Sequence, residues 1–167
     1  ALFNPSMVPH PDQSGLQKGE TRFVMSLRAT GEGHVSSIVF RTGILSPDGT
    51  IRLTPLTPYQ VLGEYSKSGS SDTDYNLVFD QDSLIEERTI FPGTAVESMG
   101  MEDLRLVKFH DKQGAGYYGT YTAYNGREIQ SRLLETRDFS SFRIRSLTGA
   151  SASDKGMGLF PEKIKGK

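Results

Sequence analysis

Residues 104–148 read LRLVKFHDKQGAGYYGTYTAYNGREIQSRLLETRDFSSFRIRSLT, and this stretch decides the fold. Short runs rich in β-branched and aromatic residues alternate here with turn signals, which is typical of strands. The strongest signal is Asn125-Gly126, because a two-residue type I′ hairpin turn needs two positive φ angles. The expected strands are 104–109, 117–124, 129–135 and 142–147. Antiparallel strands joined by such turns predict a propeller blade, or else a plain meander from a sandwich or barrel.

A weaker copy of this order precedes it. Expected strands lie at 4–8, 23–29, 37–42 and 51–54, and shorter ones at 75–79 and 88–91, with one helical turn within 82–88. Residues 63–74 are small and polar, which predicts a mobile loop or an insertion. No stretch of ten or more residues has apolar positions at helical spacing, so the predicted fold class is all-β.

Two blade-like units, roughly 1–60 and 100–150, therefore lie in one domain of 1–167, and Gly156-Met-Gly-Leu-Phe-Pro161 opens the pattern again. Propellers typically need about four to eight blades to close their ring. We therefore expect an incomplete β-propeller, with about two blades and the start of a third. Such a chain is a fragment, or one chain of a larger assembly such as a homo-oligomer.

The composition argues against several function classes. The chain has 167 residues, of which 35% are hydrophobic, a formal net charge of −1 and a pI near 6.4. No basic stripe is present to neutralise phosphates, so no nucleic-acid partner is expected. No apolar run approaches the roughly 20 residues that span a bilayer, and no signal peptide is recognised, so no membrane partner is expected. Cysteine is absent and the three histidines lack ligand spacing. We therefore expect no metal, no cofactor and a cytoplasmic location.

A compact charged motif opens the expected strand 104–109. Gly100-Met-Glu-Asp-Leu-Arg105 places two carboxylates and a guanidinium where a rigid strand can aim them. Because neighbours on a strand point to opposite faces, Asp103 and Arg105 should share one face, with Glu102 and Leu104 on the other. An acid beside a guanidinium suits proton transfer to a bound substrate. The same spacing also fits a surface ion pair, which is common and weak.

Five motifs occur in order along the chain. They are Phe3-Asn-Pro-Ser6, Ser26-Leu-Arg-Ala29, the 100–105 motif, Tyr121-Thr-Ala-Tyr-Asn-Gly126 and Asp154-Lys-Gly-Met-Gly-Leu-Phe-Pro-Glu-Lys-Ile164. Together they resemble the β-mannoside phosphorylases and β-mannosidases of glycoside hydrolase family 130. The resemblance covers nearly the whole chain, and about the first half of that family's five-bladed propeller. Leu104 departs from the family motif, which usually has Pro at that place.

The resemblance implies inverting phosphorolysis of a mannose-containing oligosaccharide, a β-mannoside, to mannose 1-phosphate, with inorganic phosphate as co-substrate. Asp103 would be the catalytic general acid, acting through the 3-hydroxyl of the bound mannose. Arg28 and Lys155 would bind phosphate. The residues expected to line the mannose subsite are Asn4, Ser6, Arg28, Arg105 and Tyr121.

The chemistry of these residue types agrees with phosphate as the nucleophile. An inverting transfer needs one acid and a nucleophile on the opposite face of the sugar ring. A phosphate nucleophile needs cations rather than a second carboxylate. Two alternatives stay open: a β-mannosidase that hydrolyses the same bond, and a non-catalytic carbohydrate-binding or structural β module. Glu102 could serve a hydrolase, although its expected role is to support the motif.

Overall fold

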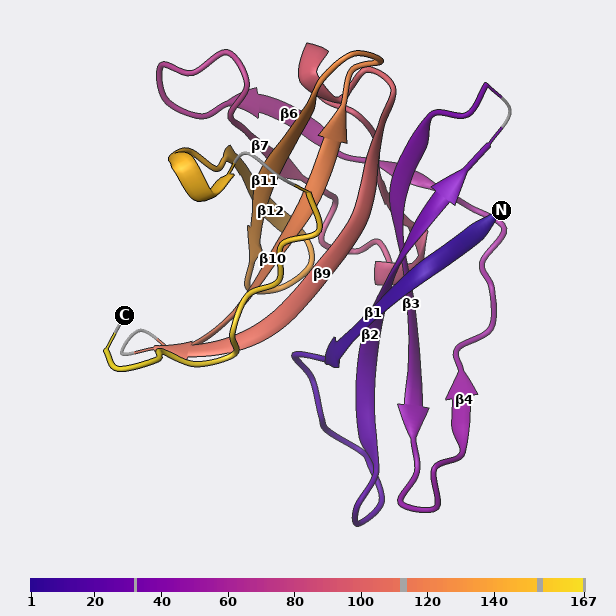
Figure 1. The fold of residues 1–167 in the computed structure, drawn as a ribbon. Helices are drawn as coiled ribbons and strands as arrows, with labels where there is room; N and C mark the ends of the chain where they lie inside the picture. Colours follow the sequence, from indigo (N-terminus) through magenta and orange to yellow (C-terminus); the bar gives the residue numbers. More distant parts are fainter. Residues whose placement is uncertain (32, 112–113, 153–154, 167) are drawn as a thin grey trace.

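The protein is all-β. The structure is a computed structural model that describes residues 1–31, 33–111, 114–152 and 155–166 (Figure 1). Within these residues twelve strands form one mixed, open sheet. The helical segments found there are three 3₁₀ turns, η1 (Ile85–Glu87), η2 (Ala95–Glu97) and η3 (Ala150–Ala152). No helix in the described part of the chain is long and apolar enough to cross a membrane.

The first half forms an antiparallel meander. Its strands are β1 (Leu2–Pro9), β2 (Thr21–Thr30), β3 (Ser36–Leu45) and β4 (Ile51–Leu53), each paired with the next. The turn before β4 closes through the Gly49 N–H, which donates to the Ser46 carbonyl at 3.0 Å. The four strands expected in this half are thus confirmed, with ends that differ by a few residues.

The second half forms the meander that residues 104–148 predict. Its strands are β9 (Gly100–Asp111), β10 (Gly114–Tyr124), β11 (Ile129–Thr136) and β12 (Ser141–Ser146), again each antiparallel to the next. In the β10–β11 turn, Asn125 Oδ1 accepts the N–H groups of Arg127 and Glu128 at 2.9 and 2.8 Å. The sheet continues from β12 into β7 (Tyr75–Val78) and then β6 (Glu64–Lys67).

The polar segment 63–74 is not simply the expected loop or insertion. Residues 64–67 form β6, which pairs antiparallel with β7 at the edge of the sheet. All four residues of β6 are exposed, because an edge strand outside the core needs no apolar side. Sequence alternation therefore gives no signal for it. The two-residue strand β5 (Val61–Leu62), which pairs in parallel with β8 (Arg88–Ile90), was also not predicted.

The two meanders meet at a narrow seam. One parallel pair, Ser36 with Gly100, joins β3 to β9. Gly100 has φ +140°, and a Cβ at this position would lie 2.9 Å from the backbone nitrogen of Ser36. Glycine is needed here because only a residue without a side chain tolerates both the backbone angle and the close approach. The sheet is open, and the incomplete β-propeller of about two blades and the start of a third stays a prediction.

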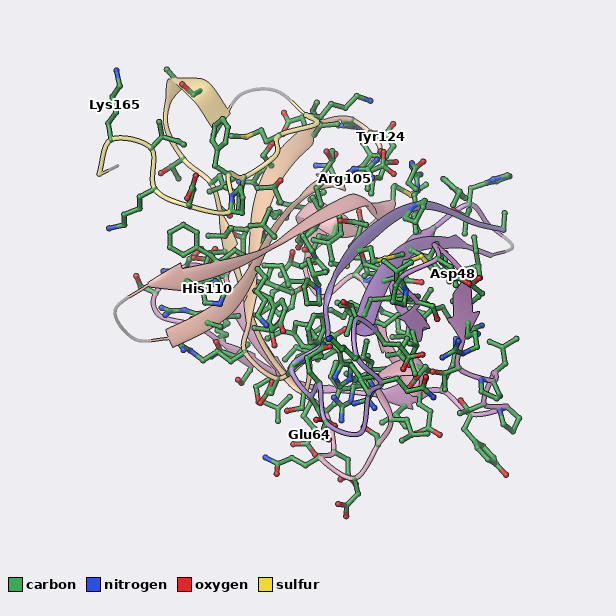
Figure 2. All side chains as sticks on the ribbon, turned by 90° about the horizontal axis from the view of Figure 1, so that it is seen from below. Asp48, Glu64, Arg105, His110, Tyr124 and Lys165 are labelled. Atoms are coloured by element: carbon green, nitrogen blue, oxygen red, sulfur yellow. The ribbon has the colours of Figure 1, made fainter. Side chains whose placement is uncertain are left out.

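The core fills the space between the two meanders, and Figure 2 shows how densely side chains occupy it. An aromatic cluster joins the halves: the Phe40 ring of β3 stacks on Phe142 of β12 at 5.8 Å, and Phe139 contacts both Phe40 and Tyr117. Each such pair contributes about 0.5–1.5 kcal/mol beyond the buried area. Aromatic packing in the core therefore stabilises the contact between the two meanders.

Candidate functional site

β9 contains a β-bulge at the charged motif. Thr120 pairs with Arg105 and Thr122 pairs with Glu102, so Asp103 and Leu104 both lie opposite Tyr121. Asp103 adopts φ +58°, in the left-handed region that a residue with a side chain enters at an energetic cost. Such strain gathers at functional sites, where the surrounding structure holds it in place. The bulge and the positive φ therefore single out Asp103 as a candidate functional residue.

The bulge overturns one expectation from strand alternation. Alternation places Glu102 on the face away from Asp103 and Arg105, but all three side chains line one pocket. The extra residue in the strand shifts the alternation by one position, so the Glu102 side chain lies on the same side of the sheet as the pocket. Leu104 alone of the motif's last four residues turns into the core, as expected.

β1 has a matching bulge, which faces the first. Its register shifts between Phe3 and Ser6, and Asn4 adopts φ +54°. The Asn4 side-chain amide donates to Asp103 Oδ1 at 2.5 Å. Two strained residues from strands about 100 positions apart are thus joined by one hydrogen bond. The sequence motifs named both residues, and the structure brings them together.

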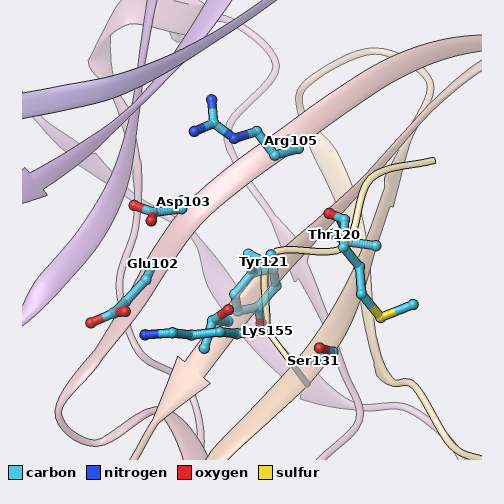
Figure 3. A pocket seen from close by; sticks show the side chains of 10 residues that line it. Glu102, Asp103, Arg105, Thr120, Tyr121, Ser131 and Lys155 are labelled. Atoms are coloured by element: carbon cyan, nitrogen blue, oxygen red, sulfur yellow. The ribbon is translucent and has the colours of Figure 1, made fainter. Parts of the chain in front are cut away.

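The pocket beside Asp103 has a volume of about 260 Å³. Its lining residues come from β9, β10, β11 and the C-terminal segment: Glu102, Asp103, Arg105, Thr120, Tyr121, Thr122, Ser131, Lys155, Gly156 and Met157 (Figure 3). Thr120 Oγ1 donates to the Met157 carbonyl at 2.5 Å and so holds the C-terminal segment across β10. Figure 3 shows the Lys155 side chain extending toward Glu102. The expected cation thus lies at the same pocket as the expected acid.

Arg28 reaches the site from the first meander and contacts both acids. Its Nη2 donates to Glu102 Oε1 at 2.8 Å, and its Nη1 lies 3.6 Å from Asp103 Oδ1. Its Nε donates to Ser36 Oγ at 2.8 Å, and the guanidinium lies 5.1 Å from the centre of the Phe3 ring. Arg28 is not among the residues that line the pocket. In this state its guanidinium is paired with the two carboxylates.

Ser6 and Arg105 occupy different positions relative to the pocket. Ser6 Oγ accepts the N–H of Leu106 at 2.9 Å, which fastens β1 to β9, and Ser6 does not line the pocket. Arg105 is exposed at the pocket rim, and its Nη1 donates to the Pro5 carbonyl at 3.0 Å. Ser6 is therefore placed as a support for β9, and Arg105 as a cation beside the acid.

The Tyr121 hydroxyl belongs to a buried polar cluster. Its hydroxyl donates to Glu97 Oε1, and the Tyr75 hydroxyl donates to Glu97 Oε2 at 3.1 Å. Burial raises the pKa of the Tyr121 phenol well above its ordinary value, and the neighbouring Tyr75 and Glu97 raise it further. Because this hydroxyl is committed to Glu97, the part of Tyr121 that borders the pocket is its ring. Tyr121 thus lines the pocket, and its role in a sugar subsite stays a prediction.

The cluster beneath Tyr121 contains two charged residues that the sequence motifs did not name. Glu97 and Arg132 are both fully buried, with Arg132 Nη1 at 3.7 Å from Glu97 Oε1. The Gly93 N–H also donates to Glu97 Oε2, at 2.9 Å. Alternation in the predicted strand 129–135 places Arg132 on the same face as Leu134, and this was the signal that could have found it.

The arrangement can hold a small, hydroxyl-rich ligand next to a carboxyl group. Two cations, Arg105 and Lys155, border the pocket with two carboxylates, Glu102 and Asp103, and threonine and serine hydroxyls add further donors and acceptors. Within the described residues no group of three His, Cys, Asp or Glu side chains could hold a metal ion. No family model, curated protein or solved structure matches this chain.

Proposed function

We propose that the protein belongs to a carbohydrate-active enzyme that cleaves β-mannosides with inversion, using Asp103 as the general acid on an incomplete β-propeller similar to those of glycoside hydrolase family 130. The observation that carries the proposal is the pair of facing bulges. They join Asn4 to Asp103 at the edge of a pocket and keep both residues in left-handed backbone conformations. A surface ion pair does not require strained backbone conformations, whereas functional sites often contain them.

The pocket suits one sugar ring rather than a long chain. Its volume of about 260 Å³ lies just below the roughly 300 Å³ at which the usual range of ligand sites begins. In the proposed reaction Asp103 gives its proton, through the 3-hydroxyl of the mannose, to the glycosidic oxygen. The bond from that oxygen to the anomeric carbon breaks as phosphate attacks the carbon from the opposite face. The products are mannose 1-phosphate and the released sugar, and Lys155 and Arg105 are the cations at the pocket that would attract the phosphate.

A second candidate is hydrolysis of the same bond. The observation that favours it is the engagement of Arg28, whose guanidinium contacts both Glu102 and Asp103. A phosphate in this pocket would meet two carboxylates, and the arginine would already be occupied. Water carries no charge and is not repelled in this way, so a hydrolase on this scaffold would be a β-mannosidase.

The test is an assay of the protein on β-mannobiose, with and without inorganic phosphate. Phosphorolysis yields mannose 1-phosphate, which ³¹P NMR detects, whereas hydrolysis yields mannose alone. Asp103→Asn should lower either rate by about 100-fold or more, which is the usual contribution of general acid catalysis. Asp82→Asn, an exposed carboxylate outside the pocket, is the matched control. Near-normal turnover by Asp103→Asn would remove Asp103 from the mechanism, and equal rates without phosphate would exclude phosphorolysis.

A further inference from the structure

We infer that Glu102 is the residue that selects between phosphate and water at this site, because it occupies the Arg28 guanidinium that phosphate would otherwise bind. The inference rests on the proposed function, which requires one of these two nucleophiles. It concerns a residue that the sequence placed on the opposite face of the strand.

Glu102 competes with any incoming anion for the Arg28 guanidinium. A guanidinium carries five N–H donors on three nitrogens. Nε donates to Ser36 Oγ and Nη2 donates to Glu102 Oε1, both at 2.8 Å. Nη1 lies 3.6 Å from Asp103 Oδ1. Glu102 therefore takes one of the Nη2 donors, and Nη1 is paired with Asp103 only at ion-pair distance. A phosphate that bound Nη1 and Nη2 together would compete with Glu102 for this part of the guanidinium.

The Arg28–Glu102 pair is shielded enough to resist that displacement. Both side chains are 19% exposed, whereas Asp103 is 39% exposed. Salt screens partly buried pairs much less than exposed ones, so the attraction within this pair persists in ordinary buffer. The Phe3 ring beside the guanidinium and the Ser36 hydroxyl on Nε fix the arginine further. These contacts keep the Arg28 guanidinium in position to pair with Glu102.

Glu102 also acts on phosphate directly, by its charge. It lines the pocket, so a bound phosphate would lie close to its carboxylate, and the two anions repel. Neutralising Glu102 removes this repulsion and at the same time weakens the hold of its side chain on Nη2 of Arg28, because the charge-assisted hydrogen bond becomes a neutral-acceptor one. Both effects favour phosphate, and neither changes the affinity for water as a nucleophile.

The experiment measures inorganic phosphate binding to the whole chain, by ¹H–¹⁵N chemical shift titration at pH 7. Glu102→Gln keeps the size of the side chain and removes its charge, and it should bind phosphate about tenfold more tightly than the parent chain. Glu64→Gln makes the same change in net charge on the exposed edge strand β6, and its affinity should equal that of the parent chain. The double variant Arg28→Gln/Glu102→Gln should lose the part of the gain that comes from Arg28 and so bind phosphate more weakly than Glu102→Gln.

Three results would overturn the inference. They are an unchanged or weaker affinity in Glu102→Gln, an equal gain in Glu64→Gln, or a gain that survives in full in the double variant. If Glu102→Gln fails to fold, Glu102→Ser carries the same expectation. The titration needs no catalysis, so its outcome is separate from the mannoside assay. Inactivity of the parent chain would count against the proposed enzyme, while an unchanged phosphate affinity would count against the role of Glu102.

Discussion

Replacing Glu97 by glutamine should destabilise the fold strongly, because it leaves a buried positive charge without its closest partner. Glu97 and Arg132 are both fully buried. The new side-chain amide keeps one acceptor oxygen but sets an NH2 group against either the Tyr121 hydroxyl or the Gly93 N–H, so the change removes the negative charge together with one acceptor. The remaining carboxylate near Arg132 is Asp74, at 3.9 Å and with a side chain 21% exposed. The buried guanidinium would therefore depend on a weaker, partly solvated partner.

The expected loss is about 3–5 kcal/mol, the usual cost of removing one partner of a buried ion pair. This is a large fraction of the roughly 5–15 kcal/mol that holds a domain folded. For a chain of this size each kcal/mol moves the melting temperature by about 2–4 °C, so Tm should fall by on the order of 10 °C. Urea denaturation at pH 7, followed by far-UV circular dichroism, gives the free energy of unfolding.

Glu64→Gln is again the matched control, and it should stay within about 0.5 kcal/mol of the parent chain because Glu64 is exposed on β6. A loss below about 1 kcal/mol in Glu97→Gln would refute the reasoning. It would mean that Asp74 or water compensates the Arg132 charge, and that the cluster under Tyr121 is not held by the Glu97 carboxylate.

Two further predictions concern the seam and the tyrosines. Gly100→Ala should cost about 2–5 kcal/mol in urea denaturation, from backbone strain and the clash with Ser36, whereas Gly158→Ala, in open space, should be neutral. Burial raises the pKa of Tyr117 to about 12 and that of Tyr121 well above its ordinary value. Because unfolded tyrosine titrates near 10, the folded state is increasingly disfavoured as the pH rises above about 10, and stability should fall steadily through about pH 12. Full tyrosinate absorbance before the circular dichroism signal changes would contradict this.

The strands could be predicted because their signals are local. Alternation and turn residues identify β1 to β4 and β9 to β12 without reference to any partner. The bulge at Asp103 could not be found in this way, because a bulge is a property of two strands in register. From its sequence alone, the motif is indistinguishable from a regular strand. The bulge is visible only in the pairing with β10, where Thr120 lies opposite Arg105 and Thr122 lies opposite Glu102. One extra residue then changes which side chains share the pocket.

The sequence predicted which residues lie at the site better than it predicted what their side chains contact. The structure gathers Asn4, Asp103, Arg105 and Lys155 at or beside one pocket, as their motifs led us to expect. Arg28 was expected to bind phosphate and sugar, and Tyr121 to line the sugar subsite. In the structure their polar ends are bound by the half-buried carboxylate of Glu102 and the buried carboxylate of Glu97. A sequence names the residue type that suits a ligand, but the competing protein acceptor becomes visible only when distant strands meet.

The seam between the meanders couples the stability of the fold to the geometry of the site. Arg28 comes from β2 in the first meander, and Glu102 and Asp103 follow Gly100 on β9 in the second. A side chain at position 100 would push β9 away from Ser36, the residue that also holds Arg28 Nε. Gly100→Ala should therefore weaken the contact of Arg28 with Glu102 as well as the fold. If Glu102 restrains Arg28 as inferred, this variant should bind phosphate more tightly than the parent chain even under conditions where it remains folded. A Gly100→Ala chain that is destabilised but has unchanged phosphate affinity would show that the seam and the site are independent.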